Sequence, residues 1–293
     1  MKTKTTEQIF IEIMNKISNK NALSKNAISS GIHSLNNTIG GWEHGVSIIS
    51  ARPSIGLTSF CLSQVHSLIH TLKDDDVIIY VADKDSPTVL IQRLLAIATQ
   101  LELSKIQNGD LTKQEIAQIA SDPITKHLEA NRLIFLTNTD SKVLHIRSFL
   151  FNLIKVGKKP KMLFVDSLQS IIDRSRDRGQ DISNVMMDVN LLSQEYKIPV
   201  LLTIPLRSRL VEFRETKFPR LTDLDSRLTN EADVVLFLTR ADYYEIIDLP
   251  EDIGDAHLII AKNEGPLNIL KLKMNKKNLA ISENLDIFPY SQI

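Results

Sequence analysis

Cysteine is almost absent from this sequence, and so is any long apolar run. Cys61 is the one cysteine among 293 residues, which excludes an internal disulfide and a cysteine-cluster metal site. It follows Phe60 in an apolar helical pattern, where a buried thiol behaves as a small hydrophobe. No stretch approaches the roughly 18 apolar residues of a membrane-spanning helix, and the first residues fit no secretory signal. We therefore expect a cytoplasmic protein without membrane contact.

The sequence also lacks an excess of either charge. Lysine plus arginine total 35, and so do aspartate plus glutamate, so no overall positive field would attract nucleic acid or an anionic membrane. Any contact with nucleic acid must come from local patches. With 43% hydrophobic and 24% charged residues, the composition is that of a globular protein, and the chain is long enough to bury one large core or two modest ones.

Residues 5–19 predict an amphipathic helix, because their large apolar side chains recur at helical spacing on one side. These side chains are Ile9, Phe10, Ile13, Met14 and Ile17. Such a stripe needs a partner surface, on the main domain or on another subunit. The polar residues 18–26 form the expected linker. We expect residues 1–28 to be helix and linker, and residues 29–293 to form one α/β domain.

From about residue 30 onward, short apolar runs alternate with helical patterns, which is typical of a mostly parallel sheet covered by helices on both faces. The expected strands are 46–50, 77–82, 132–136, 162–165, 200–203 and 234–239. The expected helices lie at about 58–73, 87–102, 113–121, 143–156 and 183–196. Near the end, 257–261 and 267–273 flank turn residues, which predicts an antiparallel hairpin at one edge of the sheet.

A lysine is missing from a loop that otherwise resembles a phosphate-binding loop. Residues 51–59, ARPSIGLTS, join the first expected strand to the first long helix. A phosphate-binding loop at such a place holds the β and γ phosphates with backbone N–H groups and one ammonium. Leu57 occupies the ammonium position, and an isobutyl group cannot donate a charge-assisted hydrogen bond. Thr58 remains as a candidate ligand of Mg²⁺. The candidate nucleotide-binding residues in this loop are Ser54, Gly56, Leu57, Thr58 and Ser59.

Five segments in compatible order carry a resemblance to a known family. They read SGIHSL with GGW (30–42), ARPSIG (51–56), FVDSLQ (164–169), EADVV with RADYY (231–244), and IIAK with GP (259–266). The chain resembles the C-terminal RecA-like motor domain of DnaB-type hexameric replicative DNA helicases over nearly everything after residue 30. This implies a RecA-like P-loop fold, although fold alone does not transfer function. The family's N-terminal collar domain has no counterpart here, and residues 5–19 look like its linker helix, which packs against the neighbouring motor domain.

The resemblance assigns roles to three further residues. Asp166 looks like the Walker B carboxylate, which holds the Mg²⁺ water shell, although an aspartate at a strand end can also cap the next turn. Gln169 fits the family's following turn, or is a simple turn residue. Asp83 stands closest to the position of the catalytic glutamate, but its carboxylate would lie about 1.5 Å back, and misplacement costs rate steeply. A solvated acidic turn is the alternative reading of Asp83.

Two other positions depart from the family pattern. Ile204 and Pro205 stand where the family has a polar sensor pair. In the terminal hairpin, Lys262 matches a lysine that reaches the neighbour's γ-phosphate, but the accompanying arginine is absent and Asn263 with Glu264 occupy a shortened turn. An arginine finger is worth roughly 10³ to 10⁵ in rate, so efficient ATP-driven translocation is not expected.

Basic loops are the candidates for single-stranded DNA binding. The residues are Arg174, Arg176, Arg178, Arg207 and Arg209. Such loops would neutralise phosphates without sequence preference, but acidic residues are interleaved with them, so solvated loops are the alternative. Lys271, Lys273 and the neighbouring Lys276 and Lys277 are read as protection of an edge strand. His66 and His70 form an i,i+4 pair that is read as a packing coincidence, since no partner ligand motif is near.

Three hypotheses of function follow. The first is a catalytically impaired DnaB-like protein that acts as a binding or regulatory component in DNA replication or on a mobile element, docked on a helicase subunit or a second copy through residues 5–19. ATP or ADP with Mg²⁺ would bind weakly or not at all. The second is a working ATPase or helicase that takes its cation from Lys84, Arg52 or a neighbour's Lys262. The third is a single-stranded DNA-binding module.

Overall fold

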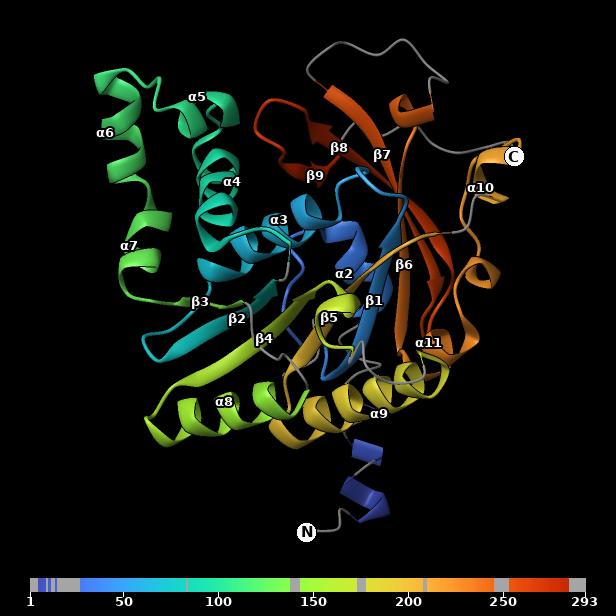
Figure 1. Cartoon of the computed structure of the whole chain (residues 1–293). Coiled ribbons are helices and arrows are strands. Elements are labelled where there is room, and N and C mark those ends of the chain that lie inside the picture. Colours follow the sequence, from blue (N-terminus) through green and yellow to red (C-terminus); the bar gives the residue numbers. More distant parts are fainter. Residues whose placement is uncertain are drawn as a thin grey trace.

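The computed structural model describes residues 5–8, 10, 11, 14, 27–82, 84–137, 143–172, 178–207, 210–244 and 253–284, with the side chains of 178–181, Tyr244 and Ile253 left out. One sheet dominates this part of the chain. Its strands are β1 Gly45–Ala51, β2 Asp76–Ala82, β3 Leu133–Thr137, β4 Lys159–Asp166, β5 Pro199–Pro205, β6 Val234–Arg240, β7 Ile253–Lys262, β8 Asn268–Asn275 and β9 Ile281–Glu283. The spatial order is β3-β2-β4-β5-β1-β6-β7-β8-β9, and Figure 1 shows its twist.

The sheet is parallel from β3 to β6 and antiparallel from β6 to β9. The expected α/β fold, with a mostly parallel twisted sheet and an antiparallel C-terminal hairpin, is therefore confirmed. The carboxyl ends of the parallel strands meet at one edge of such a sheet, which is where ligands bind in open α/β folds. Both the loop after β1 and the end of β4 lie at this edge.

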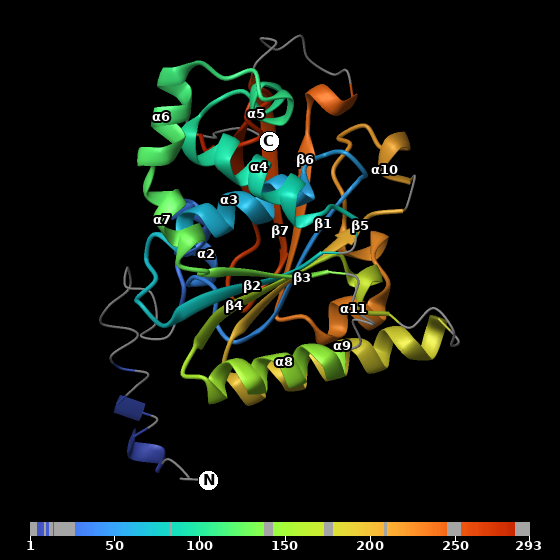
Figure 2. The ribbon, with the colours of Figure 1, turned by 60° about the vertical axis from the view of Figure 1, so that its left-hand side comes forward.

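Helices cover both faces of the sheet. They are α2 His33–Ile39, α3 Leu57–Ile69, α4 Pro87–Thr99, α5 Leu103–Asn108, α6 Lys113–Ser121, α7 Pro123–Glu129, α8 Val143–Lys155, α9 Arg178–Tyr196, α10 Leu210–Phe213 and α11 Ser226–Glu231. Helices α8 and α9 lie along one face, and α3 with α4 lie on the other (Figures 1 and 2). Strand residues alternate between the two cores: Val77 and Ile79 pack with α8 and α9, whereas Ile78 and Tyr80 pack with α3 and α4.

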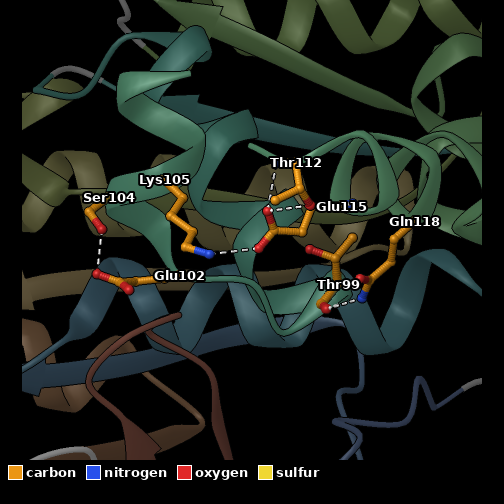
Figure 3. Close-up of polar contacts among 7 residues, drawn as sticks. All are labelled: Thr99, Glu102, Ser104, Lys105, Thr112, Glu115 and Gln118. Carbon is orange, nitrogen blue, oxygen red and sulfur yellow. Dashed lines mark hydrogen bonds and ion pairs between the residues drawn. The ribbon is translucent and has the colours of Figure 1, made fainter. Parts of the chain in front are cut away.

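Helices α4 to α7 form an arm beside the sheet (Figure 1). A small polar network joins α4, α5 and α6 (Figure 3). Thr112 and Glu115 form a capping box at the start of α6, which satisfies N–H groups that a helix start leaves unpaired. Lys105 on α5 pairs with Glu115 at 2.8 Å. Gln118 donates from Nε2 to the carbonyl oxygen of Thr99 at 2.7 Å, so the network ties α6 to the end of α4.

The structure corrects several expected boundaries. The first long helix ends at Ile69 rather than 73, because the backbone N–H of Thr71 turns back to the carbonyl of Leu68. The second ends at Thr99 rather than 102, since Gln100 has a left-handed φ of 59°. Helix α9 begins at Arg178, five residues before the expected start.

Other elements were not predicted at all. They are α2, α5, α7, α10, α11, the 3-10 turns and β9, each of which is short. Strand β9 pairs with Leu272–Met274 of β8. Over that stretch β8 is therefore an inner strand, so the reading of Lys273 as a guard of an exposed edge is wrong, whereas Lys271 lies outside the stretch.

Part of the expected N-terminal helix is described. Residues 6–8, 10, 11 and 14 are helical, and Phe10 and Ile11 are 59% and 51% exposed. Residues 9, 12, 13 and 15–19 lie outside the described residues. Ile28 forms a β-bridge with Trp42, so the chain joins the main fold at that point.

Candidate functional site

The loop between β1 and α3 has the backbone shape of a phosphate loop. Ser54 has a φ of 67° and Gly56 a φ of 125°, a conformation that side chains rarely adopt. The φ of Gly56 favours glycine, whereas a Cβ added there would make only an ordinary contact with Met274 at 3.4 Å. Helix α3 begins at Leu57 with no side-chain cap. The first N–H groups of a helix have no partner within it and favour an anion.

Leu57 cannot supply the charge that such a loop normally offers. It is half-buried and packs against the core shared by α3, α4 and the sheet. Ser59 is buried in α3, whereas Ser54 is exposed in the loop. The loop therefore offers backbone N–H groups and hydroxyls but no ammonium at position 57.

Asp166, the last residue of β4, lies at the centre of a hydroxyl network. Its Oδ2 accepts hydrogen bonds from Thr58 Oγ1 at 2.8 Å and from Tyr80 at 2.9 Å. Its Oδ1 accepts from Thr203 Oγ1 at 2.8 Å. The sheet order explains this meeting, since β4 lies between β2, which carries Tyr80, and β5, which carries Thr203. Thr58 and Asp166 are thus brought together as expected of a pair that would hold Mg²⁺.

Tyr80 and Thr203 are site residues that the sequence reading missed. The only local signal is a hydroxyl within an apolar strand, VIIYVA for β2 and VLLTI within β5. Burial, with the Asp166 carboxylate as the second cause, raises the pKa of Tyr80 well above its usual value. The phenol therefore stays protonated and remains a donor. Burial likewise raises the pKa of Cys61, which sits in α3 behind the loop, as expected for an inert core thiol.

Gln169 lies in the 3-10 turn after β4, and its Oε1 accepts from Ser167 Oγ at 2.6 Å. The peptide bond between Asp166 and Ser167 is cis. Gln169 thus follows Asp166 closely in the chain, as the resemblance implies. Its side-chain oxygen is occupied by the hydrogen bond from Ser167.

Two of the three cations named as possible substitutes for the missing lysine have other partners. Arg52 donates to the Leu206 carbonyl at 2.9 Å and forms an ion pair with Glu212. Lys84 is exposed after β2. Lys262 donates to the carbonyls of Thr229 at 2.7 Å and Ala232 at 2.6 Å. It lies opposite Val235, near the start of β6, so it is at the far end of the sheet from this chain's own phosphate loop.

Most of the expected DNA-contacting side chains are not described. Arg174, Arg176 and Arg209, as well as the catalytic candidate Asp83, lie outside the described residues. Arg178 is the first residue of α9, and its side chain is also outside them. Arg207 is exposed after β5, which leaves it as the described member of this set.

The histidine pair has gained a third member. The rings of His66 and His70 meet edge to face with centroids 4.9 Å apart, and His127 of α7 lies 5.3 Å from His70. Within the described ranges, no group of three or more His, Cys, Asp or Glu side chains is placed to hold a metal ion. None of the helices described there is long and apolar enough to cross a bilayer.

The fold and the site define a P-loop protein of the RecA-like class. A family model of the DnaB-like helicase C-terminal domain matches residues 27–283, and the chain belongs to that family. The ATPase domain of G40P superposes with a TM-score of 0.83 at 24% identity, over 96% of this chain and 99% of that one. A DnaB-like replicative helicase, solved in a study of its interactions with primase, gives 0.81 at 24% identity over 96% of this chain and 67% of that chain.

The chain is also similar to curated replicative DNA helicases. A probable replicative DNA helicase of Trieres chinensis is 29% identical over 276 residues, 92% of this chain and 59% of the relative. The replicative DNA helicase DnaB of Helicobacter pylori is 27% identical over 241 residues, 80% of this chain and 48% of the relative. The chain therefore spans about half the length of the curated relatives it matches.

Proposed function

We propose that this protein is a catalytically impaired member of the DnaB-like family, a non-catalytic binding or regulatory component of DNA replication located in the cytoplasm. The observation that carries the proposal is Leu57, which packs against the core where a phosphate loop presents its ammonium. The names of the relatives, replicative DNA helicases, supply the process. We take residues 29–293 as the motor-type domain and residues 1–28 as its helix and linker.

A second loss supports the same conclusion. The turn between β7 and β8 is closed by Asn263, which accepts from the Gly265 N–H and donates to the Pro266 carbonyl at 3.2 Å. No arginine stands in this turn, and Glu264 is exposed. Starting from a turnover of about 10 per second, the loss of an arginine finger alone would leave at best about 10⁻² per second.

Weak nucleotide binding is retained in this proposal. The N–H groups at the start of α3 favour an anion, and Thr58 with Asp166 would hold the hydrated Mg²⁺ of ATP or ADP. The missing lysine removes a charge-assisted bond of about 1.5–3 kcal/mol. Bound nucleotide therefore acts here as a ligand, and its hydrolysis does not drive movement.

Partner binding is assigned to residues 5–19. The exposed apolar side chains of Phe10 and Ile11 are the kind that dock a helix on a groove, and we propose another motor domain as the partner, in a second copy or in an active helicase subunit. Deleting residues 5–19 should then lower the particle mass of the assembly. Single-stranded DNA remains a secondary ligand through the basic loops, with Arg207 exposed to meet it.

The Leu57→Lys variant separates an impaired site from a compensated one. A site that lacks only the ammonium should bind Mg-ATP at least about tenfold more tightly in Leu57→Lys than in wild type. A site already served by another cation should gain little. Leu144→Lys is the matched control. Leu144 is 64% exposed on α8, so this substitution adds the same charge on the other face of the sheet. Equal affinities in all three proteins would contradict the proposal.

A further inference from the structure

A buried charged cluster lies beside the phosphate loop, on the side of the C-terminal strands. Arg240, the last residue of β6, donates from Nε to Asp242 Oδ1 at 3.0 Å and from Nη2 to Asp242 Oδ2 at 2.6 Å. Lys276, just after β8, approaches the same carboxylate at 3.1 Å. The side chains of Arg240 and Asp242 are only 13% and 12% exposed, so water screens this bidentate pair little.

The remaining side of the Arg240 guanidinium reaches the loop itself. Its Nη1 donates to the carbonyl oxygen of Ile55 at 3.3 Å and lies equally close to Met274 Sδ. The Ile55 carbonyl belongs to the same peptide group as the Gly56 N–H. A cation hydrogen-bonded to the oxygen of a peptide polarises that peptide and strengthens its N–H as a donor.

Packing joins this cluster to the loop as one unit. Met274 contacts Arg240 Nη1, and it is also the nearest atom group to a Cβ placed on Gly56, at 3.4 Å, with Ile281 at 3.7 Å. Gly254 in β7 leaves room for Asp242, since an added Cβ would lie 3.1 Å from its Oδ1. The two hydrogen bonds to Asp242 hold the guanidinium where its Nη1 meets the Ile55 carbonyl.

The charge of the cluster suits this role. Burial acts to raise the pKa of Asp242, but the hydrogen bonds from Arg240 and Lys276 outweigh it and hold the pKa below its usual value. Asp242 thus remains a carboxylate and fixes the guanidinium in plane. Two cations and one carboxylate leave one net positive charge next to a loop that has no ammonium at position 57.

We propose that Arg240 is the positioning residue of the phosphate loop. It fixes the shape of the loop and strengthens the Gly56 N–H as a donor through the Ile55 carbonyl, in a loop where Leu57 replaces the usual ammonium. This deepens the proposed function, on which it rests for the identity of the ligand as a nucleotide phosphate chain. Arg240 itself does not touch that ligand. Its charge reaches the phosphates through the Ile55–Gly56 peptide.

Two measurements on Arg240→Gln and Arg240→Lys test this proposal, with Arg214→Gln as the matched control. Arg214 makes the same bidentate pair with Asp223 without contact to the loop. The first measurement is the amide proton resonance of Gly56 in the unliganded protein. It should move upfield in Arg240→Gln, move less in Arg240→Lys, and stay in place in Arg214→Gln.

The second measurement is the affinity for Mg-ATP and for inorganic pyrophosphate in the Leu57→Lys background. Adding Arg240→Gln should weaken both by about tenfold, adding Arg240→Lys should weaken them less, and adding Arg214→Gln should leave them unchanged. An unmoved Gly56 resonance in Arg240→Gln would overturn the proposal, and this test does not depend on nucleotide binding. If the Leu57→Lys protein binds Mg-ATP, unchanged affinities after adding Arg240→Gln would also overturn it. Rapid ATP turnover by wild type would instead overturn the proposed function and leave this test intact.

Discussion

Thr58 and Asp166 are hydrogen-bonded at 2.8 Å although 108 residues separate them in the chain. In a phosphate-loop protein these two side chains hold the Mg²⁺ of the nucleotide, and here they are in contact with each other directly. Leu57, the residue next to Thr58, carries no charge. The proposed metal-binding pair is therefore in direct contact, while the proposed phosphate-binding part of the loop offers backbone N–H groups and hydroxyls.

The hydroxyl of Thr58 should contribute to stability as well as to metal binding. In Thr58→Val the shape is kept but Asp166 Oδ2 loses a donor, so the free energy of unfolding should fall by about 1.5–3 kcal/mol, the range for a hydrogen bond to a charged group. Urea denaturation would measure this. Thr99→Val is a suitable comparison, because the Thr99 hydroxyl donates to the neutral Leu95 carbonyl; if both variants lose equally little, Asp166 does not depend on Thr58.

Tyr80→Phe tests the second donor to the same oxygen. The ring stays stacked near Phe164, whose centroid is 5.7 Å away, so only the hydroxyl is lost. We expect the unfolding free energy to fall by about 1–3 kcal/mol, since the half-buried Asp166 carboxylate loses a donor. A melting curve identical to that of wild type would show that the Tyr80 hydroxyl does not stabilise Asp166.

These contacts mark the limit of what the sequence could predict. The strands and the long helices follow from local apolar patterns, Thr58 follows from the phosphate-loop pattern, and Asp166 follows from the resemblance. Tyr80 and Thr203 could not be predicted as partners of Asp166, because the sheet order that brings β2, β4 and β5 together is not written in any local pattern. Strand β9 is three residues long, too short for a periodic signal.

Lys262 is a second residue whose contacts could not be predicted from the sequence. The resemblance implied that Lys262 contacts the γ-phosphate bound by a neighbouring subunit. In the structure its ammonium caps the end of α11 by donating to the carbonyls of Thr229 and Ala232. Helix α11 covers only six residues and was not predicted, so the capping role had no basis in the sequence. The assignment to a neighbour's phosphate stays a prediction.

Removing the ammonium of Lys262 distinguishes the two roles. Lys262→Met keeps the stem but leaves carbonyls of α11 unpaired, so the unfolding free energy should fall by about 1–3 kcal/mol. The measurement is chemical denaturation of dilute protein. If stability holds and only the nucleotide affinity of an assembled form drops, the capping contacts seen here do not account for Lys262.

Glu115 in the helical arm should titrate far from its usual range (Figure 3). The hydrogen bond from Lys105, helped by two from Thr112, lowers the pKa of Glu115 from 4.5 to about 2. Its stabilising contribution is therefore complete above pH 4.5 and is lost as the pH falls through about 2. Carboxyl NMR should find this midpoint, and Lys105→Met should raise it. An ordinary midpoint in both proteins would mean that the network does not persist in solution.

The central claim is that this chain keeps the architecture of a DnaB-like motor without the cations that drive hydrolysis. The most direct measurement is the steady-state rate of ATP hydrolysis by the purified protein with Mg²⁺ and single-stranded DNA. The account predicts a turnover at or below about 10⁻² per second. A turnover near 10 per second, about that of a typical enzyme, would contradict it.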